Sequence, residues 1–302
     1  MEMQEANDNV LLRRIKELNK PMLPEPTGVE PKLSRMVKVK AVIFDIYGTL
    51  FTCKCGEISS AQVEAQSVFQ KALRSSGFQC LSRQAGNRAN NRLKYWIDYY
   101  HMERKREGVE NPEVDIKKIW EHILTELVDE KLIKGETGPR AVCRIAVEYE
   151  CRVNPIWPMP HLRVTLESLM NAGMKLGIVS NAQFYTLLQI QAFNEMGRSI
   201  GRFLPELCAW SFQLMEAKPS IRLLHIILEQ LAGRYDISPA ETLCVGNDML
   251  NDITPAAQLG CKTALFAGDK KSLRLRRQEP RCTGIEPDLV ITSLEQLSNA
   301  LG

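Results

Sequence analysis

Six short apolar runs, each about as long as a β-strand, most limit what this chain can fold into. In chain order they are VKAVIFD, MKLGIVSN, LCAWSF, TLCVGND, CKTALFAG and DLVIT. Stretches with the apolar spacing of amphipathic helices lie between or after most of these runs, at 162–171, 184–193, 220–232 and 294–301. Strands that alternate with helices form a parallel sheet that is covered on both faces. We therefore predict an α/β fold with a doubly wound, Rossmann-like parallel sheet.

The alternation is interrupted between about residues 56 and 150. Four helical patterns follow one another there with no clear strand: AQVEAQSVFQKALRSSGF, NRANNRLKYWIDYYHMERKR, DIKKIWEHILTELVDE and RAVCRIAVEYECRV. A short helical pattern at 8–19 and a segment with four prolines within residues 20–32 precede the first strand. The predicted organisation is an N-terminal helix and Pro-rich arm (1–37), a core domain in two pieces (38–55 and 151–302), and a helical cap inserted after the first strand (56–150).

Charge and composition exclude several classes of protein. The 39 basic and 36 acidic residues give a net charge of +3, which is too balanced to indicate binding to nucleic acid or to a membrane surface. No apolar stretch reaches the roughly 20 residues of a membrane helix, and the first 20 residues do not resemble a signal peptide. The nine cysteines include no CxxC pair, which favours reduced thiols. We predict a cytoplasmic protein.

Polar residues follow the predicted strands at the edge where parallel α/β sheets bind ligands. In chain order they are Asp45 with Thr49, Ser180 with Asn181, Lys218, and the segment GNDMLND, which contains Asp248 and Asp252. Together these four groups resemble the four ordered motifs of the haloacid dehalogenase superfamily of hydrolases, over about residues 38–54 and 160–292. The helical insertion falls where this superfamily commonly carries its cap.

The side-chain types at these positions suit nucleophilic catalysis. A carboxylate such as Asp45 attacks the substrate and forms an aspartyl intermediate, which water then hydrolyses. Thr49 and Ser180 can donate hydrogen bonds to developing negative charge, with Asn181 beside them. Lys218 brings a positive charge close to the nucleophile. Each of these residues also has a structural interpretation, as a turn or helix cap or as a surface lysine.

The resemblance implies a Mg²⁺ site, because Mg²⁺ prefers oxygen ligands. Its implied ligands are Asp45, the backbone carbonyl of Tyr47 and one carboxylate of GNDMLND. The chain departs here from the commonest pattern of the superfamily, in which Asp directly follows the Gly, because Asn247 stands at that position. Alignment on the Gly makes Asn247 the ligand, and alignment on the Asp-x-x-x-Asp spacing makes it Asp248. We favour Asp248 as the direct ligand. Asp252 would then either support the metal ligands from outside the coordination shell or pair with Lys218.

Tyr47 separates two branches of the superfamily. Phosphatases usually have an Asp two residues after the nucleophile, which protonates the leaving alkoxide and then activates water. Tyr, with an ordinary pKa near 10, is a poor base at neutral pH. The 2-haloacid dehalogenase branch resembles this chain in having Tyr there, and a departing halide needs no proton. Such an enzyme also needs a cationic cradle for the halide, for which the cap offers Arg88 and Arg92.

The fourth motif, GNDMLND, favours the phosphatase branch because it resembles a metal-binding loop. A dehalogenase would not need such a loop, since displacement of halide from carbon needs no metal. The favoured prediction is therefore Mg²⁺-dependent hydrolysis of a small phosphorylated metabolite. The alternative is metal-independent 2-haloacid dehalogenation, and a further alternative is a non-enzymatic protein that binds a metabolite or a partner. The predicted ligand in each enzymatic case is a small anionic metabolite, with no nucleic acid and no membrane.

Overall fold

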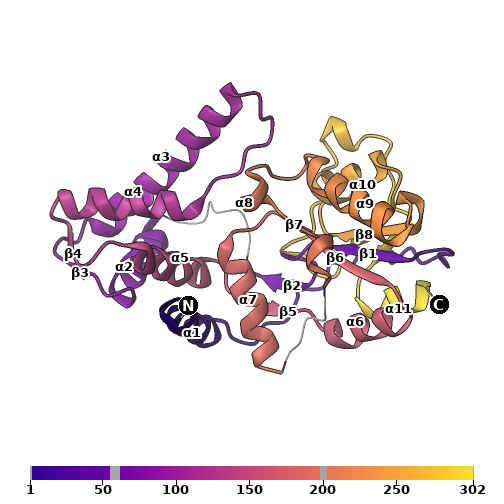
Figure 1. Ribbon diagram of the computed structural model, residues 1–302, viewed down its shortest axis with the longest axis horizontal. Helices are drawn as coiled ribbons and strands as arrows, with labels where there is room; N and C mark the ends of the chain where they lie inside the picture. Colours follow the sequence, from indigo (N-terminus) through magenta and orange to yellow (C-terminus); the bar gives the residue numbers. More distant parts are fainter. Residues whose placement is uncertain (1, 55–61, 198–202, 302) are drawn as a thin grey trace. The chain divides into compact units, whose positions relative to one another are not determined.

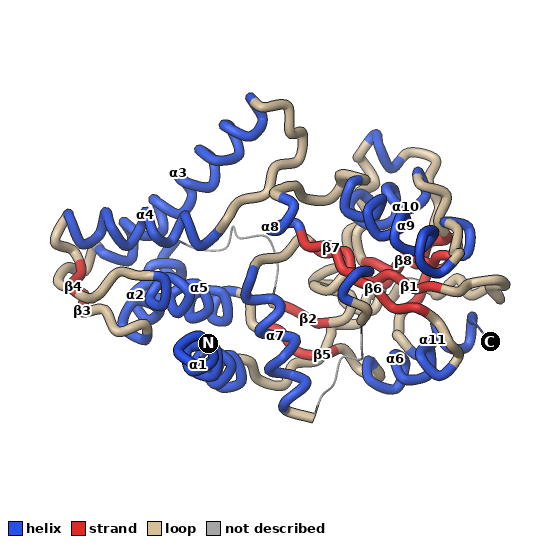
Figure 2. The backbone as a smooth tube through the Cα atoms, viewed as in Figure 1, coloured by secondary structure: helices blue, strands red, loops and turns tan. Residues whose placement is uncertain are grey.

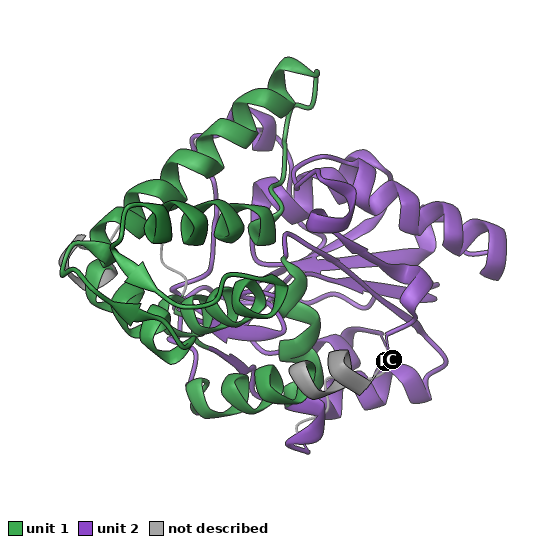
Figure 3. Ribbon diagram, turned by 60° about the vertical axis from the view of Figure 1, so that its left-hand side comes forward, with its two compact units in different colours: residues 1–20, 54–155, 183–192 green, residues 21–53, 156–182, 193–302 purple. Residues whose placement is uncertain are grey.

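The computed structural model describes residues 2–54, 62–197 and 203–301, which divide into two compact units (Figure 3). The helical unit comprises Met1–Lys20, Lys54–Pro155 and Gln183–Ala192. The sheet unit comprises Pro21–Cys53, Ile156–Ala182 and Phe193–Gly302. The predicted boundary between core and cap at residues 55 and 56 lies outside the described residues.

The sheet unit is built on six parallel strands in the order β10-β9-β8-β1-β6-β7 (Figure 2). The strands are β1 (Ala41–Phe44), β6 (Lys175–Ser180), β7 (Cys208–Trp210), β8 (Thr242–Gly246), β9 (Lys262–Phe266) and β10 (Leu289–Ile291). Each of the six apolar runs of the sequence forms one of them, so the predicted α/β fold is confirmed. β1 lies in the interior between β6 and β8, and all four of its residues are buried. The chain visits β6 and β7 on one side of β1 before it crosses to β8 on the other.

Helices cover both faces of this sheet (Figure 1). α6 (Leu162–Asn171) packs with α11 (Glu295–Leu301), while α9 (Arg222–Tyr235) packs on β6 and β7 and α10 (Thr254–Gln258) on β9. α9 places Leu223, Ile227 and Leu231 at helical spacing, and all three are fully buried in the core. Shorter elements complete the unit: β2 (Phe51–Cys53), β5 (Ile156–Pro158), η1 (Pro205–Leu207), α8 (Ser211–Leu214), η2 (Pro239–Glu241), η3 (Met249–Ile253) and η4 (Pro280–Cys282).

The helical unit contains the four helices expected in the insertion, namely α2 (Gln62–Ser75), α3 (Ala85–Arg106), α4 (Ile116–Asp129) and α5 (Pro139–Val153). α1 (Glu2–Leu18) and residues 184–192 of α7 (Phe184–Glu195) belong to the same unit. Its core includes Phe69, Trp120 and Ile123, none more than 1% exposed. The expectation of no strand in this region is wrong, because β3 (Gln79–Cys80) pairs with β4 (Ile133–Lys134). Two-residue strands are too short to produce a periodic sequence pattern.

Residues 21–40, here called the arm, belong to the sheet unit. Lys32 pairs with Val290 of β10 as an isolated antiparallel bridge, and the Met36 amide donates to the carbonyl of Ala300 at 2.8 Å. The prolines keep the arm from joining the sheet as a continuous strand, because proline lacks the N–H that a strand ladder requires.

None of the helices among the described residues has the length and apolar run that crossing a bilayer requires. Of the cysteines in the part of the chain that the structure describes, seven are free, but Cys53 is in a disulfide bond, which the expectation of reduced thiols did not include. Sequence spacing alone does not say whether two sulfur atoms come within bonding distance.

Candidate active site at the carboxyl edge of the sheet

The polar residues found in the sequence converge because they follow parallel strands. Asp45 comes directly after β1, Ser180 ends β6, and Asp252 lies in η3 after β8. The carboxyl ends of parallel strands meet at one edge of a sheet, and ligands bind there at the point where the strand order reverses. In this sheet that point lies at β1, between β6 and β8.

The carboxylate of Asp45 is held by three donors. Its Oδ1 accepts hydrogen bonds from Lys218 Nζ at 2.7 Å and from Ser180 Oγ at 3.3 Å. Its Oδ2 accepts one from Thr49 Oγ1 at 3.2 Å. The side chain is nearly buried, and the Asp45 amide donates to the carbonyl of Val245 on β8 at 2.9 Å. The three donors fix the orientation of Asp45. Oδ1 accepts two of these hydrogen bonds and Oδ2 accepts one.

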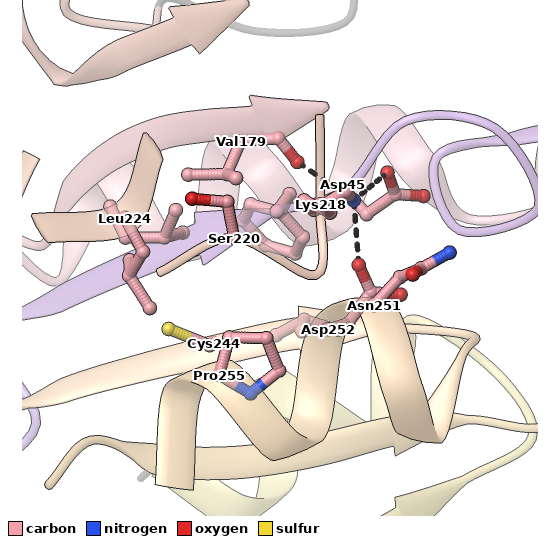
Figure 4. A pocket seen from close by; sticks show the side chains of 12 residues that line it. Asp45, Val179, Lys218, Ser220, Leu224, Cys244, Asn251, Asp252 and Pro255 are labelled. Atoms are coloured by element: carbon pink, nitrogen blue, oxygen red, sulfur yellow. Dashed lines mark hydrogen bonds and ion pairs between the residues drawn. The ribbon is translucent and has the colours of Figure 1, made fainter. Parts of the chain in front are cut away.

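Lys218 uses all three of its ammonium protons (Figure 4). Besides Asp45, Nζ donates to Asp252 Oδ1 at 2.6 Å and to the carbonyl of Val179 at 3.2 Å. An ammonium group has three donors and no acceptor, so this geometry satisfies it completely. Burial acts to lower the pKa of Lys218, but the charges of Asp252 and Asp45 outweigh burial and raise it. Lys218 is therefore a permanent cation between two carboxylates.

Asp252 is the second carboxylate of this arrangement. Burial raises its pKa to about 7, the charge of Asp45 adds to the rise, and Lys218 opposes it. Its Oδ2 accepts from the amide of Asp248 at 3.0 Å. The space is made by Gly246, because a Cβ at that position would lie 2.3 Å from the Cβ of Asp252. The GNDMLND segment thus needs its glycine for close packing against Asp252.

Asn181 has a contact that the sequence reasoning missed. Its Oδ1 accepts from the Lys218 amide at 2.7 Å, and its Nδ2 donates to the Lys218 carbonyl at 3.3 Å. Both ends of the Asn181 amide thus hold the backbone of Lys218, whereas the sequence placed Asn181 only beside the predicted donors Thr49 and Ser180. A polar residue directly after one strand, followed by a lysine after the next, is the only sequence signal for this contact.

A tight turn brings Thr49 to Asp45. The Gly48 amide donates to the carbonyl of Phe51 at 2.7 Å, and Gly48 has φ +87°, a left-handed conformation that favours glycine. Half-buried Tyr47 precedes it and pairs with Phe51 as an isolated bridge. The sequence Tyr-Gly-Thr is therefore a turn that returns the Thr49 hydroxyl to Asp45.

The two residues that compete for the metal position are oriented differently. Asn247 Oδ1 accepts from Thr49 Oγ1 at 3.1 Å, so it shares a donor with Asp45. Asp248 is turned to Arg276, whose Nε and Nη2 donate to its two oxygens at 3.0 and 2.7 Å. Asp248 also caps the start of η3, accepting from the Leu250 amide at 2.9 Å. The geometry thus brings Asn247, in place of the favoured Asp248, beside Asp45.

Arg276 lies between β9 and β10 and is not among the site residues predicted from the sequence. The bidentate pair with Asp248 neutralises one of the acids of the fourth motif. Among residues 2–54, 62–197 and 203–301, no group of three His, Cys, Asp or Glu side chains is arranged to hold a metal ion. The oxygen atoms that could hold a cation at this edge are those of the Asp45 carboxylate, the Asn247 amide oxygen and, as the resemblance implies, the Tyr47 carbonyl. That set suits Mg²⁺, which prefers oxygen ligands and retains several waters.

The fold and this carboxylate-centred edge define a hydrolase with a Rossmann-like core. The family model described as haloacid dehalogenase-like hydrolase matches residues 39–260. The chain therefore belongs to the haloacid dehalogenase-like hydrolases.

The chain is similar to several solved structures. A 2-haloacid dehalogenase from Pseudomonas syringae pv. Tomato DC3000 is 18% identical, with a TM-score of 0.50, over 87% of this chain and 97% of that chain. A HAD phosphatase from Thermococcus onnurineus is 19% identical, with a TM-score of 0.45, over 87% and 98%. An L-2-haloacid dehalogenase from Xanthobacter autotrophicus is 19% identical, with a TM-score of 0.46, over 86% and 97%. No curated protein matches the chain.

Proposed function

We propose that this hydrolase is a cytoplasmic enzyme that cleaves a small phosphorylated metabolite through an aspartyl-phosphate intermediate on Asp45. The observation that carries the proposal is the set of three hydrogen bonds that hold the Asp45 carboxylate. One cation and two hydroxyl groups hold this carboxylate at the ligand-binding edge of the sheet, within a chain of this family. A carboxylate that is oriented in advance loses little freedom when it attacks, which favours nucleophilic catalysis.

The chemical steps follow from the contacts of Asp45. Oδ2 attacks phosphorus, and the bond from phosphorus to the leaving oxygen breaks. Lys218, Ser180 and Thr49 lie where negative charge on the transferring group is stabilised. Water then attacks the aspartyl phosphate, which releases inorganic phosphate and restores the carboxylate. Tyr47 is a poor base for this water, so the proposed substrates are those with a good leaving group, such as acyl phosphates and phosphoanhydrides.

The proposed metal ligands differ in one position from those favoured on the sequence. Asp45, the Tyr47 carbonyl and Asn247 would hold Mg²⁺, and Asp248 would stay with Arg276. The bound ion would neutralise charge on the phosphoryl group. Asp252 would then not bind the metal and would act as the partner of Lys218, as their hydrogen bond at 2.6 Å supports.

The second candidate is 2-haloacid dehalogenation. Tyr47 and Asn247 favour it, because both replace carboxylates that a metal-dependent phosphatase commonly carries, and the Arg276 pair removes the charge of Asp248. The expected halide cradle argues against it. Arg92 is paired with Glu126 and lies 4.2 Å from the centre of the Tyr95 ring, and Arg88 is paired with Glu130. Both arginines therefore already have partners within the helical unit.

A parallel assay separates these proposals. Purified protein is incubated with acyl phosphates, phosphoanhydrides and phosphomonoesters, and separately with 2-haloacids, each with Mg²⁺ or with a chelator. We expect Mg²⁺-dependent phosphate release, reduced by at least about 10³-fold in Asp45→Asn because the amide is not a nucleophile. Halide release in chelator would reject the phosphatase proposal in favour of the second candidate. Full phosphate release by Asp45→Asn would reject the aspartyl mechanism, and silence in both assays would favour a binding protein.

A further inference from the structure

The arm is attached to the loop that follows β9. Thr27 Oγ1 donates to the carbonyl of Ala267 at 2.6 Å. The Glu25 amide donates to Asp269 Oδ1 at 3.1 Å, and the Lys270 amide donates back to the Glu25 carbonyl at 2.7 Å. Three hydrogen bonds within a few residues join these segments, which are more than 200 positions apart in the sequence.

Asp269 is the centre of this attachment and is completely buried. Its Oδ2 accepts from Thr52 Oγ1 at 2.8 Å, and its Oδ1 accepts from the Lys271 amide at 3.2 Å as well as from Glu25. Burying a carboxylate is costly unless donors surround it. The Glu25 N–H is therefore one of the groups that make this position of Asp269 possible.

The same loop reaches the candidate active site through Ser272. The Ser272 amide donates to the Asp269 carbonyl at 3.2 Å, and Ser272 Oγ donates to the carbonyl of Gly48 at 3.2 Å. The Ser272 carbonyl accepts from Asn247 Nδ2 at 2.5 Å. A carbonyl oxygen can only accept, so this contact turns the Asn247 nitrogen toward Ser272 and the Asn247 oxygen toward Thr49. A carboxylate at position 247 would instead face the carbonyl with a second acceptor.

We propose that the arm is a positioning element of the active site. The Glu25 N–H holds Asp269, Asp269 holds the loop that ends at Ser272, and Ser272 sets which end of the Asn247 amide faces the nucleophile. The expected effect of the arm on metal binding and turnover rests on the proposed function. The structural coupling from Glu25 to Asn247 is independent of that function and is tested separately.

The test uses two matched proline variants of the full chain. Glu25→Pro removes the N–H that reaches Asp269, and Lys32→Pro removes the N–H that donates to the Val290 carbonyl at 2.9 Å. Both positions already follow a proline, Pro24 and Pro31. Glu25→Gln keeps the N–H and removes only the ion pair of the Glu25 side chain with Lys271.

Hydrogen–deuterium exchange is followed by mass spectrometry in peptides covering 245–253 and 269–276. In Glu25→Pro we expect exchange to rise about fivefold in both, as for the loss of one net hydrogen bond. In Lys32→Pro the rise is confined to peptides around 288–292, and Glu25→Gln exchanges as the wild type does. Unchanged exchange at 245–253 in Glu25→Pro, or an equal rise there in Lys32→Pro, overturns the proposal. If Glu25→Pro does not fold, Thr27→Val, which loses the bond to Ala267, is judged by the same criterion.

Calorimetric titration with Mg²⁺ alone supplies the functional readout. We expect the dissociation constant of Mg²⁺ to rise about threefold in Glu25→Pro, and kcat to fall with KM unchanged, with neither effect in Lys32→Pro. Wild-type protein that neither binds Mg²⁺ nor turns over substrate would contradict the proposed function, and the exchange measurement would still decide whether the arm positions Asn247. Mg²⁺ affinity and kcat as in the wild type, together with raised exchange, would overturn the positioning role.

Discussion

Lys218 is shared by two carboxylates, and this sharing determines the electrostatics of the site at the scale of single residues. Asp45 and Asp252 accept from the same ammonium group at 2.7 and 2.6 Å. Burial is the main cause of the raised pKa of Asp252, about 7; the charge of Asp45 adds to the rise, and the shared Lys218 opposes it without cancelling it. Asp45 thus has a neighbour whose charge changes near neutral pH.

The raised pKa of Asp252 predicts a pH dependence of stability. A carboxyl group whose folded-state pKa lies above its unfolded value of 3.8 binds more protons in the folded state between about pH 4 and 7. Its contribution to stability is therefore complete below pH 4 and is lost as the pH rises toward 7. We expect the free energy of unfolding of the wild type, minus that of Asp252→Asn, to fall by about 1 kcal/mol per pH unit in that range.

Urea unfolding of both proteins at several pH values between 4.5 and 8 measures this difference. Asp252→Asn has no titrating group at the position, so it corrects for every other acid in the chain. A difference that rises with pH, or that does not change, would show that Asp252 is ionised throughout the range.

Gly246 supplies a second prediction at this scale. In Gly246→Ala the new Cβ would lie 2.3 Å from Asp252, so the carboxylate must leave its position beside Lys218. We expect a loss of about 1–3 kcal/mol in the free energy of unfolding, as for overpacking of a core, and at least tenfold lower turnover. The measurements are chemical denaturation and the phosphate-release assay.

The matched control for Gly246→Ala is Gly233→Ala in α9. A Cβ there meets no atom within 4 Å, and alanine favours a helix over glycine by up to about 1 kcal/mol. This control should leave turnover unchanged and stability equal or higher. Equal behaviour of the two variants would mean that the packing of Gly246 against Asp252 has no functional role.

At the scale of elements, α1 is fastened to α5 by a buried ion pair in the helical unit. The Glu148 side chain of α5 is fully buried, and Arg14 of α1 and Arg152 both donate to it. Burial acts to raise the pKa of Glu148, but the hydrogen bonds from Arg14 and Arg152 outweigh burial and lower it. A carboxyl group with a lowered pKa stabilises the fold above its ordinary pKa and loses that contribution as the pH falls through the folded value.

Arg14→Met should therefore destabilise the helical unit by roughly 3 kcal/mol at neutral pH, because it removes one partner of a buried charge. The difference from the wild type should shrink as the pH is lowered and Glu148 becomes protonated. Circular dichroism during denaturant unfolding at pH 7 and at acidic pH measures both effects. Arg13→Met is the control, because the Arg13 side chain is 70% exposed and loses only an ion pair with Glu17 at 3.9 Å. Similar losses in the two variants would contradict a special role for the buried pair.

At the scale of the whole molecule, the alternation of strands and helices was readable because strands buried on both faces are continuous apolar runs. All six strands of the parallel sheet lie where the pattern predicts, and so do the helices expected at 162–171, 184–193, 220–232 and 294–301, whereas the short helices α8 and α10 were not predicted. The β3–β4 pair was missed because its strands have two residues each. The contact of the Asn181 amide with Lys218 was missed because it joins residues after two different strands, and no local pattern records such a pairing.

The sequence by itself determined the α/β fold and the set of polar residues at the strand ends, because both depend on local periodicity and on the shared direction of parallel strands. Only the tertiary structure decided what each of those residues contacts. It turned Asp248 to Arg276 and Asn247 to Thr49 and Ser272, and it paired Lys218 with two acids. Hydrogen-bond partners depend on distances between segments that are remote in the chain, and residue order alone does not specify such distances. The orientation of the Asn247 amide therefore depends on the loop that ends at Ser272, which the residue order does not place beside it.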